Sequence, residues 1–389
     1  MSRSWFCLFS LVTATLAGEL MVGSPPAESD QVTLDNWILS PYNRWGYVNV
    51  RRLFPTAEVK GNRLTPPLEK KETALMERKV SMFDGEEWSL RDLFAKADTD
   101  GLIVLHQGKV VAEEYYNLTK PDSKHVLYSI TKSIVGTLAG LYVEEGRLDP
   151  EALVVKYVPE LVGSGYEEAT VQNVLDMGVD LEERADEEFT SFNQERWSVY
   201  KYVATLAAGE AEHGKVFEYR SPNACVMGWI LEKIGGKPLT DLISERLWIP
   251  MGAEDSMDAV VDFVGTPVCS GGFSATLRDM ARFGLLIQQG GKGVVPSEWV
   301  EDIRYSGDKE AFSRGELSLY MPGGAYRNFW WIKPDGSIAG IGAYGQLLYI
   351  NFEEELVVVK LASQEDYRDL EAYFLTEEGI REIRKALIK

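Results

Sequence analysis

A serine and a lysine three residues apart open the segment YSITKSIVG, residues 128–136. A serine hydroxyl is a weak nucleophile until a neighbouring base takes its proton. Positions i and i+3 of a helix share a face, so the stem of Lys132 would lie beside the hydroxyl of Ser129. Burial and the positive end of a helix both lower the pKa of a lysine, which favours the neutral amine that such a base requires.

The S-x-x-K spacing alone does not identify a nucleophile, because it recurs at residues 198–201 and 306–309. The lysine of the first repeat fits a solvent-facing helix position, and the second repeat lies in a polar loop. The match at Ser129 opens a nearly uncharged helix that is rich in small residues. We therefore predict Ser129 as the nucleophile and Lys132 as its base. The alternative is a helix-capping serine followed by a surface lysine.

A tyrosine precedes the next clear apolar helix, in FEYRSPNACVMGWILEKIGG, residues 217–236. The phenol of Tyr219 could relay a proton, and Ser221 or Asn223 could hold a substrate. The alternative is a tyrosine that packs at the helix entry, with Asn223 as the helix cap.

The third segment is glycine-dense, GIGAYGQLLYI at residues 340–350, and reads as the beginning of a strand. The absence of side chains at glycine lets the backbone approach a ligand closely. An exposed N–H in this segment could complete an oxyanion hole with the N–H of Ser129.

Competing chemistries leave no local signature. There is no G-x-S-x-G nucleophile elbow, and GGFSATL misses it by one position. The three histidines are scattered, so they indicate neither a Ser-His-Asp triad nor a metal cluster, and we expect no cofactor or metal. The three cysteines are Cys7, Cys225 and Cys269, and we expect the last two to behave as buried small hydrophobes.

The composition of the 389-residue chain is that of a soluble globular protein, with 45% hydrophobic and 26% charged residues. Its formal net charge of −20 would repel a phosphate backbone, which argues against a nucleic-acid partner. A small-molecule substrate is the expected partner, for a monomer or a homodimer.

The periodicity of the chain predicts an α+β fold. A hairpin is expected at 101–117, a helix at 129–146, a helical stretch over 149–249, strands at 327–334, 337–352 and 355–364, and a final helix at 376–389. Strands at both ends of the body suggest one antiparallel sheet flanked by helices, with a helical region inserted. We expect an N-terminal arm at 23–75, an α/β domain at 76–148 and 250–389, and a mainly helical domain at 149–249.

Residues 1–22 show the pattern of a signal peptide, because Arg3 precedes an uncharged stretch that ends in small residues. The stretch is too short to span a bilayer. A cleaved leader would place the protein in the periplasm or outside the cell, and Cys7 would be lost with it. Otherwise the protein would be cytoplasmic, with translation starting at Met21 or with the segment packed on the domain.

These elements, in this order, resemble the penicillin-recognising serine hydrolases, which include class C β-lactamases, DD-peptidases and related esterases. Their pattern is S-x-x-K, then Y-x-N or Y-x-S, then a K-T-G-like strand. Further blocks, such as TLDNWILSPYNRW, YVPELVGSGY, GGFSATLRDMARFG and NFWW, resemble the 6-aminohexanoate-dimer hydrolase (nylon-oligomer hydrolase) branch from about Thr33 onward.

The resemblance implies a role for each matching residue. Ser129 would be the nucleophile, Lys132 its base and Tyr219 the proton relay to the leaving group. The N–H groups of Ser129 and Ala343 would form the oxyanion hole. Substrate would be contacted by Ser221, Ser270, Trp331 and Tyr344.

Two departures from that pattern bear on the substrate. AYG replaces K-T-G, so the cation that grips a β-lactam carboxylate is missing, and Tyr344 stands where the nylon-oligomer hydrolases have a histidine. The loop from Leu181 to Gln194 lacks the tyrosine with which they hold the amide nitrogen. We therefore expect an acyl-enzyme hydrolase of carboxylic esters with small acyl groups. An amidase of linear amides such as 6-aminohexanoate oligomers is the second expectation, and a catalytically silent, penicillin-binding-like sensor is an alternative of another class.

Overall fold

A seven-stranded antiparallel sheet forms the centre of the molecule in the computed structural model, which describes residues 20–71, 73–82, 85–182 and 198–388. The strand order is β5-β4-β13-β12-β11-β10-β9. The strands are β4 (Thr99–His106), β5 (Lys109–Tyr115), β9 (Ala325–Arg327), β10 (Trp330–Ile332), β11 (Ile338–Gly342), β12 (Gln346–Asn351) and β13 (Leu356–Ala362). The predicted sheet built from distant segments is confirmed, because the last strand, β13, pairs with β4.

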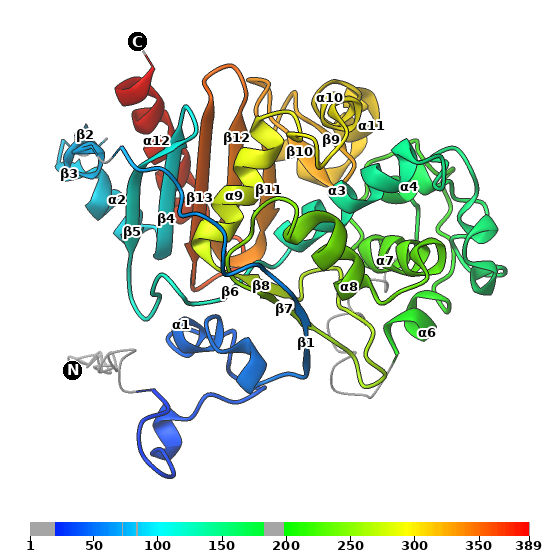
Figure 1. The fold of residues 1–389 in the computed structure, drawn as a ribbon, viewed down its shortest axis with the longest axis horizontal. Helices are drawn as coiled ribbons and strands as arrows, with labels where there is room; N and C mark the ends of the chain where they lie inside the picture. Colours follow the sequence, from blue (N-terminus) through cyan, green and yellow to red (C-terminus); the bar gives the residue numbers. More distant parts are fainter. Residues whose placement is uncertain (1–19, 72, 83–84, 183–197, 389) are drawn as a thin grey trace, which may run out of the picture.

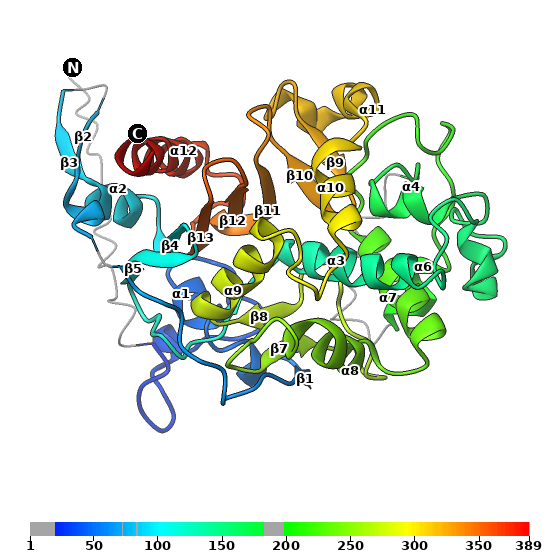
Figure 2. The same ribbon diagram turned by 45° about the horizontal axis from the view of Figure 1, so that its top comes forward.

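Helices cover both faces of this sheet (Figure 2). Helix α12 (Leu370–Leu387) runs along one face and packs on α2 (Leu90–Lys96), whereas α9 (Leu277–Gln288) crosses the other face over β4, β12 and β13. A Cβ atom at Gly284 would lie 2.6 Å from Val357 of β13, so glycine permits the close approach of α9 to the sheet. Helix α3 (Ile130–Glu144) packs beside β10, β11 and β12.

A largely helical region gathers at one side of the sheet, to the right in Figure 1. It contains α4 (Val171–Leu175), α6 (Val199–Val203), α7 (Pro222–Gly235) and α8 (Leu239–Ile243). Helix α7 lies at its centre, in contact with α3, α4, α6 and α8. The pairing of α3 with α7 joins this region to the predicted nucleophile.

A second sheet of very short strands was not predicted. Its order is β1-β7-β8-β6, with β1 (Thr56–Val59), β6 (His125–Val126), β7 (Met257–Val260) and β8 (Phe273–Ala275), all paired antiparallel. This sheet ties the N-terminal segment, which also carries α1 (Asn43–Gly46), to β6. Because β6 runs directly into Tyr128 and Ser129, the second sheet sets where helix α3 begins.

Two predicted boundaries are wrong. The expected strand 337–352 is a hairpin, because β11 and β12 pair antiparallel across the turn Ala343–Gly345. Tyr344 and Gly345 take positive φ angles of 59° and 88°, which reverse the chain within an otherwise extended run. The final helix begins at Leu370 rather than 376, because the Asp369 carboxylate caps it by accepting the Ala372 N–H.

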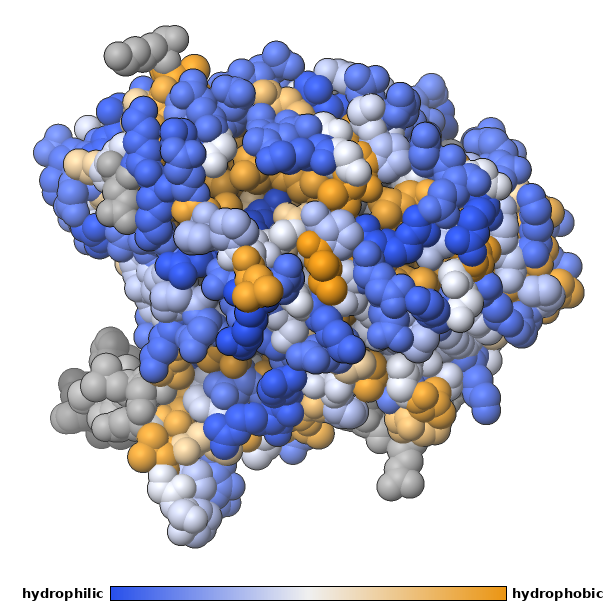
Figure 3. Space-filling view, in the orientation of Figure 1, coloured by the Kyte–Doolittle hydropathy of each residue, from blue (hydrophilic) through white to orange (hydrophobic). Residues whose placement is uncertain are grey.

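The remaining elements lie around the main sheet. They are the hairpin of β2 (Lys79–Ser81) and β3 (Glu87–Ser89), and helices α10 (Ser297–Tyr305) and α11 (Lys309–Arg314). Hydrophilic residues dominate the face of the molecule that Figure 3 shows, in keeping with the formal net charge of −20.

Candidate active site

Ser129, which is partly buried, and Lys132, which is buried, form a pair at the start of α3. Ser129 occupies the N-cap position, but its hydroxyl makes no capping hydrogen bond. Instead, Ser129 Oγ accepts a hydrogen bond from Lys132 Nζ at 2.8 Å. Lys132 is only 1% exposed, and its Nζ also donates to the Ser270 carbonyl at 2.5 Å. The alternative of a capping serine and a surface lysine is therefore wrong.

The two other S-x-x-K matches differ from this pair in burial. Lys201 is exposed, as its helix position predicts, and both Ser306 and Lys309 are exposed. An exposed ammonium stays hydrated and charged, and therefore makes a poor base for a neighbouring hydroxyl. Burial, rather than the spacing, distinguishes the match at Ser129.

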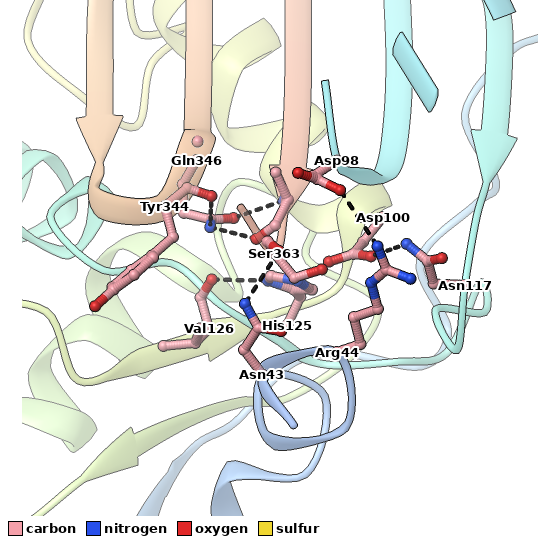
Figure 4. Close-up of polar contacts among 12 residues, drawn as sticks. Asn43, Arg44, Asp98, Asp100, Asn117, His125, Val126, Tyr344, Gln346 and Ser363 are labelled. Atoms are coloured by element: carbon pink, nitrogen blue, oxygen red, sulfur yellow. Dashed lines mark hydrogen bonds and ion pairs between the residues drawn. The ribbon is translucent and has the colours of Figure 1, made fainter. Parts of the chain in front are cut away.

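The chain reaches Ser129 through strand β6, which a buried contact between a histidine and an aspartate anchors (Figure 4). The His125 ring lies with Nε2 3.1 Å from Asp100 Oδ2 and Nδ1 2.9 Å from the Val126 carbonyl oxygen. Asn117 Nδ2 donates to the other Asp100 oxygen at 2.7 Å. These contacts fix β6 against β4, three residues before the nucleophile.

Tyr128, immediately before Ser129, has a strained backbone with a φ of 44°. A left-handed conformation is disfavoured by about 1–2 kcal/mol for a residue with a Cβ atom, so neighbouring contacts must hold it. The Tyr128 ring packs at 5.3 Å from those of both Tyr47 and Tyr344, and stacks on Trp37 at 6.4 Å. Burial raises the pKa of its phenol well above the usual value, so this tyrosine stays protonated and serves as a wall.

The ring of Tyr219 lies beside the lysine amine, and the role of its hydroxyl as a proton relay stays a prediction. Lys132 Nζ is 4.9 Å from the centroid of the Tyr219 ring. That ring stacks on Trp331 at 5.5 Å with 25° between the planes, and meets Tyr326 edge-on at 6.0 Å. The stacking fixes the orientation of Tyr219 and brings Trp331, another predicted site residue, into the same wall.

Ser221 and Asn223 follow Tyr219 at the start of α7. Ser221, which is partly buried, takes the N-cap position. Asn223 is fully buried and accepts a hydrogen bond from the Tyr166 hydroxyl at 2.9 Å. Because Asn223 lies inside the helix, the alternative in which it caps the helix is wrong. Its amide instead joins α7 to the loop that carries Tyr166.

The turn Ala343–Gly345 lies against the segment that leads to the nucleophile. A Cβ atom at Gly342 would be 2.5 Å from the Leu127 carbonyl oxygen, so only glycine permits this approach. The Tyr344 ring adds a second contact between the turn and this segment, because it packs against the Tyr128 ring. The turn thus lies against the two residues that precede Ser129, and the oxyanion hole formed by the Ser129 and Ala343 N–H groups stays a prediction.

Ser270 meets the site through its backbone. Its carbonyl accepts the Lys132 hydrogen bond, and its side chain is 8% exposed. The glycine that follows, Gly271, packs on Tyr128, where an added Cβ would lie 3.4 Å from the Tyr128 backbone. The segment around Ser270 therefore contacts both Lys132 and Tyr128, the two residues on either side of Ser129 in this site.

Tyr344 lines a pocket of about 440 Å³ that is acidic. The other lining residues are Ile38, Leu39, Glu365, Asp366, Tyr367 and Asp369. Among the described residues that line this pocket there is no lysine or arginine. Burial, together with the nearby Asp366 carboxylate, raises the pKa of the Tyr344 phenol, so this side chain stays a neutral hydrogen-bond donor.

Three residues of this region were missed by sequence analysis. Gln346 and Lys360 donate hydrogen bonds to carbonyl groups of the turn Ala343–Gly345, and the ring of Tyr128 packs against that of Tyr344 in this turn. Gln346 and Lys360 did leave a signal, because each is a lone polar residue within an apolar strand, in GQLLYI and VVVKLA. The strain at Tyr128 left none.

Several expectations concern absences or parts outside the described residues. Within the described ranges, no three His, Cys, Asp or Glu residues are grouped so as to hold a metal ion. None of the helices in those ranges is long and apolar enough to cross a membrane. Most of the predicted leader, Cys7, and the greater part of the loop 181–194 lie outside the described residues.

The beta-lactamase family model matches residues 90–377, which contain the Ser129 pair, Tyr219 and the turn Ala343–Gly345. The chain belongs to the beta-lactamase family. It is a serine hydrolase of that fold, and it is 32% identical to the 6-aminohexanoate-dimer hydrolase of Paenarthrobacter ureafaciens over 379 residues, which cover 91% of this chain and 94% of the relative.

Solved structures agree with this family assignment. A Bacillus anthracis protein named as a candidate 6-aminohexanoate-dimer hydrolase matches with a TM-score of 0.84 at 27% identity, over 94% of this chain and all of that one. EstCE1, described as a hydrolase with promiscuous acyltransferase activity, matches with a TM-score of 0.61 at 14% identity, over 77% of this chain and 98% of that one. The second likeness concerns the fold alone.

Proposed function

We propose that this beta-lactamase-family enzyme hydrolyses acyl compounds through an acyl-enzyme on Ser129. The contact of Lys132 Nζ with Ser129 Oγ, at 2.8 Å inside the protein, carries this proposal. The base atom must lie within about 2.6–3.2 Å of the heavy atom that carries the proton it removes. The Ser270 carbonyl holds the amine in that place without supplying a competing proton acceptor of carboxylate strength.

The reaction has two halves. Lys132 takes the Ser129 proton while Oγ bonds to the acyl carbon, and the N–H groups of Ser129 and Ala343 stabilise the oxyanion. As the oxyanion collapses, the bond to the leaving group breaks, and Tyr219 passes a proton to that group. Lys132 then passes the proton that it took from Ser129 to Tyr219, which restores both groups. Water attacks the acyl carbon and gives a proton to these groups, the bond to Ser129 Oγ breaks, and Oγ takes up that proton as the acid is released.

Carboxylic esters with small acyl groups are the proposed substrates. An alkoxide leaves with less protonation than an amine does, so an ester depends less on a precise proton donor. The loop 181–194 contains no tyrosine that could hold an amide nitrogen, and this loss harms ester cleavage least.

A linear amide such as a 6-aminohexanoate oligomer is the second candidate substrate. The 32% identity to a 6-aminohexanoate-dimer hydrolase, over 91% of this chain, favours it. Both candidates use the same acyl-enzyme, and they differ in the help that the leaving group needs.

A β-lactam is a poor substrate in this proposal, although the family takes its name from such enzymes. Penicillins carry a carboxylate, and the pocket beside Tyr344 presents Glu365, Asp366 and Asp369 to it. Like charges at short range oppose binding, and the described lining offers no cation to offset them.

Turnover of p-nitrophenyl esters, nitrocefin and 6-aminohexanoate dimer, measured side by side, tests the proposed function. We expect the short-chain esters to be cleaved fastest and nitrocefin slowest. An activated-serine probe should add its mass to the wild type and not to Ser129→Ala. Dimer turnover comparable to that of the esters would instead make the amide the substrate. If the wild type is neither labelled by the probe nor able to turn over the esters, the protein is a catalytically silent binding protein.

A further inference from the structure

The turn between β11 and β12 has a backbone that does not hold its shape unaided. Tyr344 sits at φ 59° and ψ 29°, a left-handed conformation that residues with a Cβ atom rarely adopt. Gly345 follows with φ at 88°. An extended neighbouring conformation would be more favourable for Tyr344, so other parts of the protein must maintain the turn.

Two buried side chains bind the three carbonyl groups of this turn. Gln346 Nε2 donates to the Ala343 carbonyl at 3.3 Å and to the Tyr344 carbonyl at 3.1 Å. Lys360 Nζ donates to the Gly345 carbonyl at 3.4 Å. Gln346 is 1% exposed and Lys360 is fully buried, so water does not compete for these contacts. Figure 4 shows the Gln346 amide reaching back toward Tyr344.

The Gln346 amide is itself anchored on the central strand β13. Its Nε2 donates to the Ala362 carbonyl at 2.6 Å, and its Oε1 accepts the Ala362 N–H at 3.0 Å. The regular pairing of β12 with β13 ends at Leu347 and Lys360, so Gln346 is the first residue beyond it. The side chain of Gln346 therefore continues the hydrogen-bond ladder beyond the last backbone pair, and fixes the turn to a fully buried strand of the sheet.

Ala343 is restrained on both sides by these contacts. On one side, Gly342 is pressed against the Leu127 carbonyl, two residues before Ser129. On the other side, Gln346 holds the Ala343 carbonyl. In a trans peptide the carbonyl of one residue opposes the N–H of the next, so Gln346 fixes the peptide plane between Ala343 and Tyr344. The contact of Gly342 with Leu127 restrains the preceding plane, which carries the Ala343 N–H.

We infer that Gln346, backed by Lys360, is a positioning residue that aims the Ala343 N–H at the oxyanion. This inference rests on the proposed acyl-enzyme function, in which that N–H stabilises the tetrahedral intermediate. Gln346 touches neither the substrate nor Ser129 in this assignment, and its effect passes through the turn Ala343–Gly345.

Gln346→Met tests the inference, because methionine has a similar length but no amide. A second variant, Gln346→Glu, keeps an acceptor for the Ala362 N–H and removes the donor to the turn. The readout is kcat and KM for p-nitrophenyl acetate and for its thiono analogue. Sulfur accepts hydrogen bonds weakly, so the oxygen-to-sulfur ratio of kcat/KM reports on the oxyanion donors.

Both variants should lower kcat for the oxygen ester roughly 10- to 100-fold, with little change in KM, and should reduce the oxygen-to-sulfur ratio by a similar factor. The matched control is Asn351→Leu at the other end of β12, where the buried amide accepts the Glu354 N–H at 3.0 Å. This control should lower the melting temperature and leave the ratio unchanged.

A wild-type ratio in either folded Gln346 variant would overturn the inference, and so would an equal fall of the ratio in Asn351→Leu. Failure of the proposed function has a different signature. In that case the wild type itself neither turns over the ester nor is labelled at Ser129, and the inference falls with it.

Discussion

Lys132 Nζ lies between two oxygen atoms, the hydroxyl of Ser129 at 2.8 Å and the carbonyl of Ser270 at 2.5 Å. The Ser270 carbonyl accepts a hydrogen bond but exchanges no proton with the amine. It therefore orients the amine of Lys132 and leaves the protonation state of the amine unchanged. The hydroxyl can give one. This asymmetry directs the reactivity of the lysine toward Ser129.

Replacement of Lys132 with methionine should lower the rate of acylation by about 10²- to 10⁴-fold, the usual contribution of a general base. Methionine retains the length and the buried packing, so the fold should persist. The burst of p-nitrophenolate in stopped-flow mixing measures the step. Lys201→Met, at an exposed S-x-x-K lysine, is the control and should acylate normally. An undiminished burst in Lys132→Met would exclude this residue as the base.

Replacement of Tyr219 with phenylalanine should separate esters from amides. The ring keeps its stacking on Trp331, and only the hydroxyl is lost. We expect amide cleavage to fall by about 10²-fold or more and ester cleavage by about 10-fold or less, because the amine needs its proton to leave. The ratio of the two kcat values measures the effect. Tyr326→Phe, in the same aromatic cluster, should leave that ratio alone, and an equal loss for both substrates would argue against a relay role for Tyr219.

Lys360 should make stability rise with pH above about 8. Burial lowers its pKa from 10.5 to about 8, so the folded protein releases this proton before the unfolded chain does. Between these two values the unfolded state binds more protons, and the contribution to stability grows with pH; it is lost as the pH falls through 8. The shift corresponds to on the order of 3 kcal/mol.

Urea unfolding of the wild type and of Lys360→Met across pH 7–11 measures this contribution as the difference between their free energies of unfolding. The difference should change in favour of the wild type between about pH 8 and 10.5. Lys96→Met, at an exposed lysine, should show a constant difference. A constant difference for Lys360→Met as well would contradict the lowered pKa.

The acidic pocket beside Tyr344 should discriminate against anionic substrates. For Asp366→Asn we expect kcat/KM for mono-p-nitrophenyl succinate to rise about 2- to 5-fold at low salt, with p-nitrophenyl acetate unaffected, because an exposed charge acts weakly through water. Added salt should remove the gain. Glu353→Gln, which changes an exposed carboxylate at the far end of β12, is the control. An equal gain in the control would assign the effect to net charge.

The elements that sequence reasoning predicted are those with a sustained period. The hairpin of β4 and β5, helix α3 and the strand β13 are seven or more residues long, apart from their turns, and each shows its apolar pattern. Buried Cys225 and Cys269 were likewise predicted from residue type, and this is confirmed. Such features depend on local composition, which a single sequence displays.

The parts that escaped prediction depend on long-range pairing. Strand β6 has two residues and β8 has three, too few for any period, and they exist because each finds a partner more than a hundred residues away. The turn at Tyr344 lies within a run that reads as one strand, and its reversal depends on Gln346 reaching Ala362. Ser129 and Lys132 could be predicted, whereas the hydrogen bonds by which Gln346 holds the turn Ala343–Gly345 could not.

The place of β13 in the sheet has a consequence for how the protein is made. This strand is the last to leave the ribosome, yet it lies between β4 and β12 near the middle of the sheet. Until β13 is synthesised, β4 and β12 each have an unpaired edge, and the Gln346 amide lacks its hydrogen-bond partner Ala362. Ser129 and Lys132 are synthesised more than two hundred residues before β13, so the turn held by Gln346 cannot take its final place until β13 has been made. Unpaired strand edges expose the nascent chain to aggregation until then.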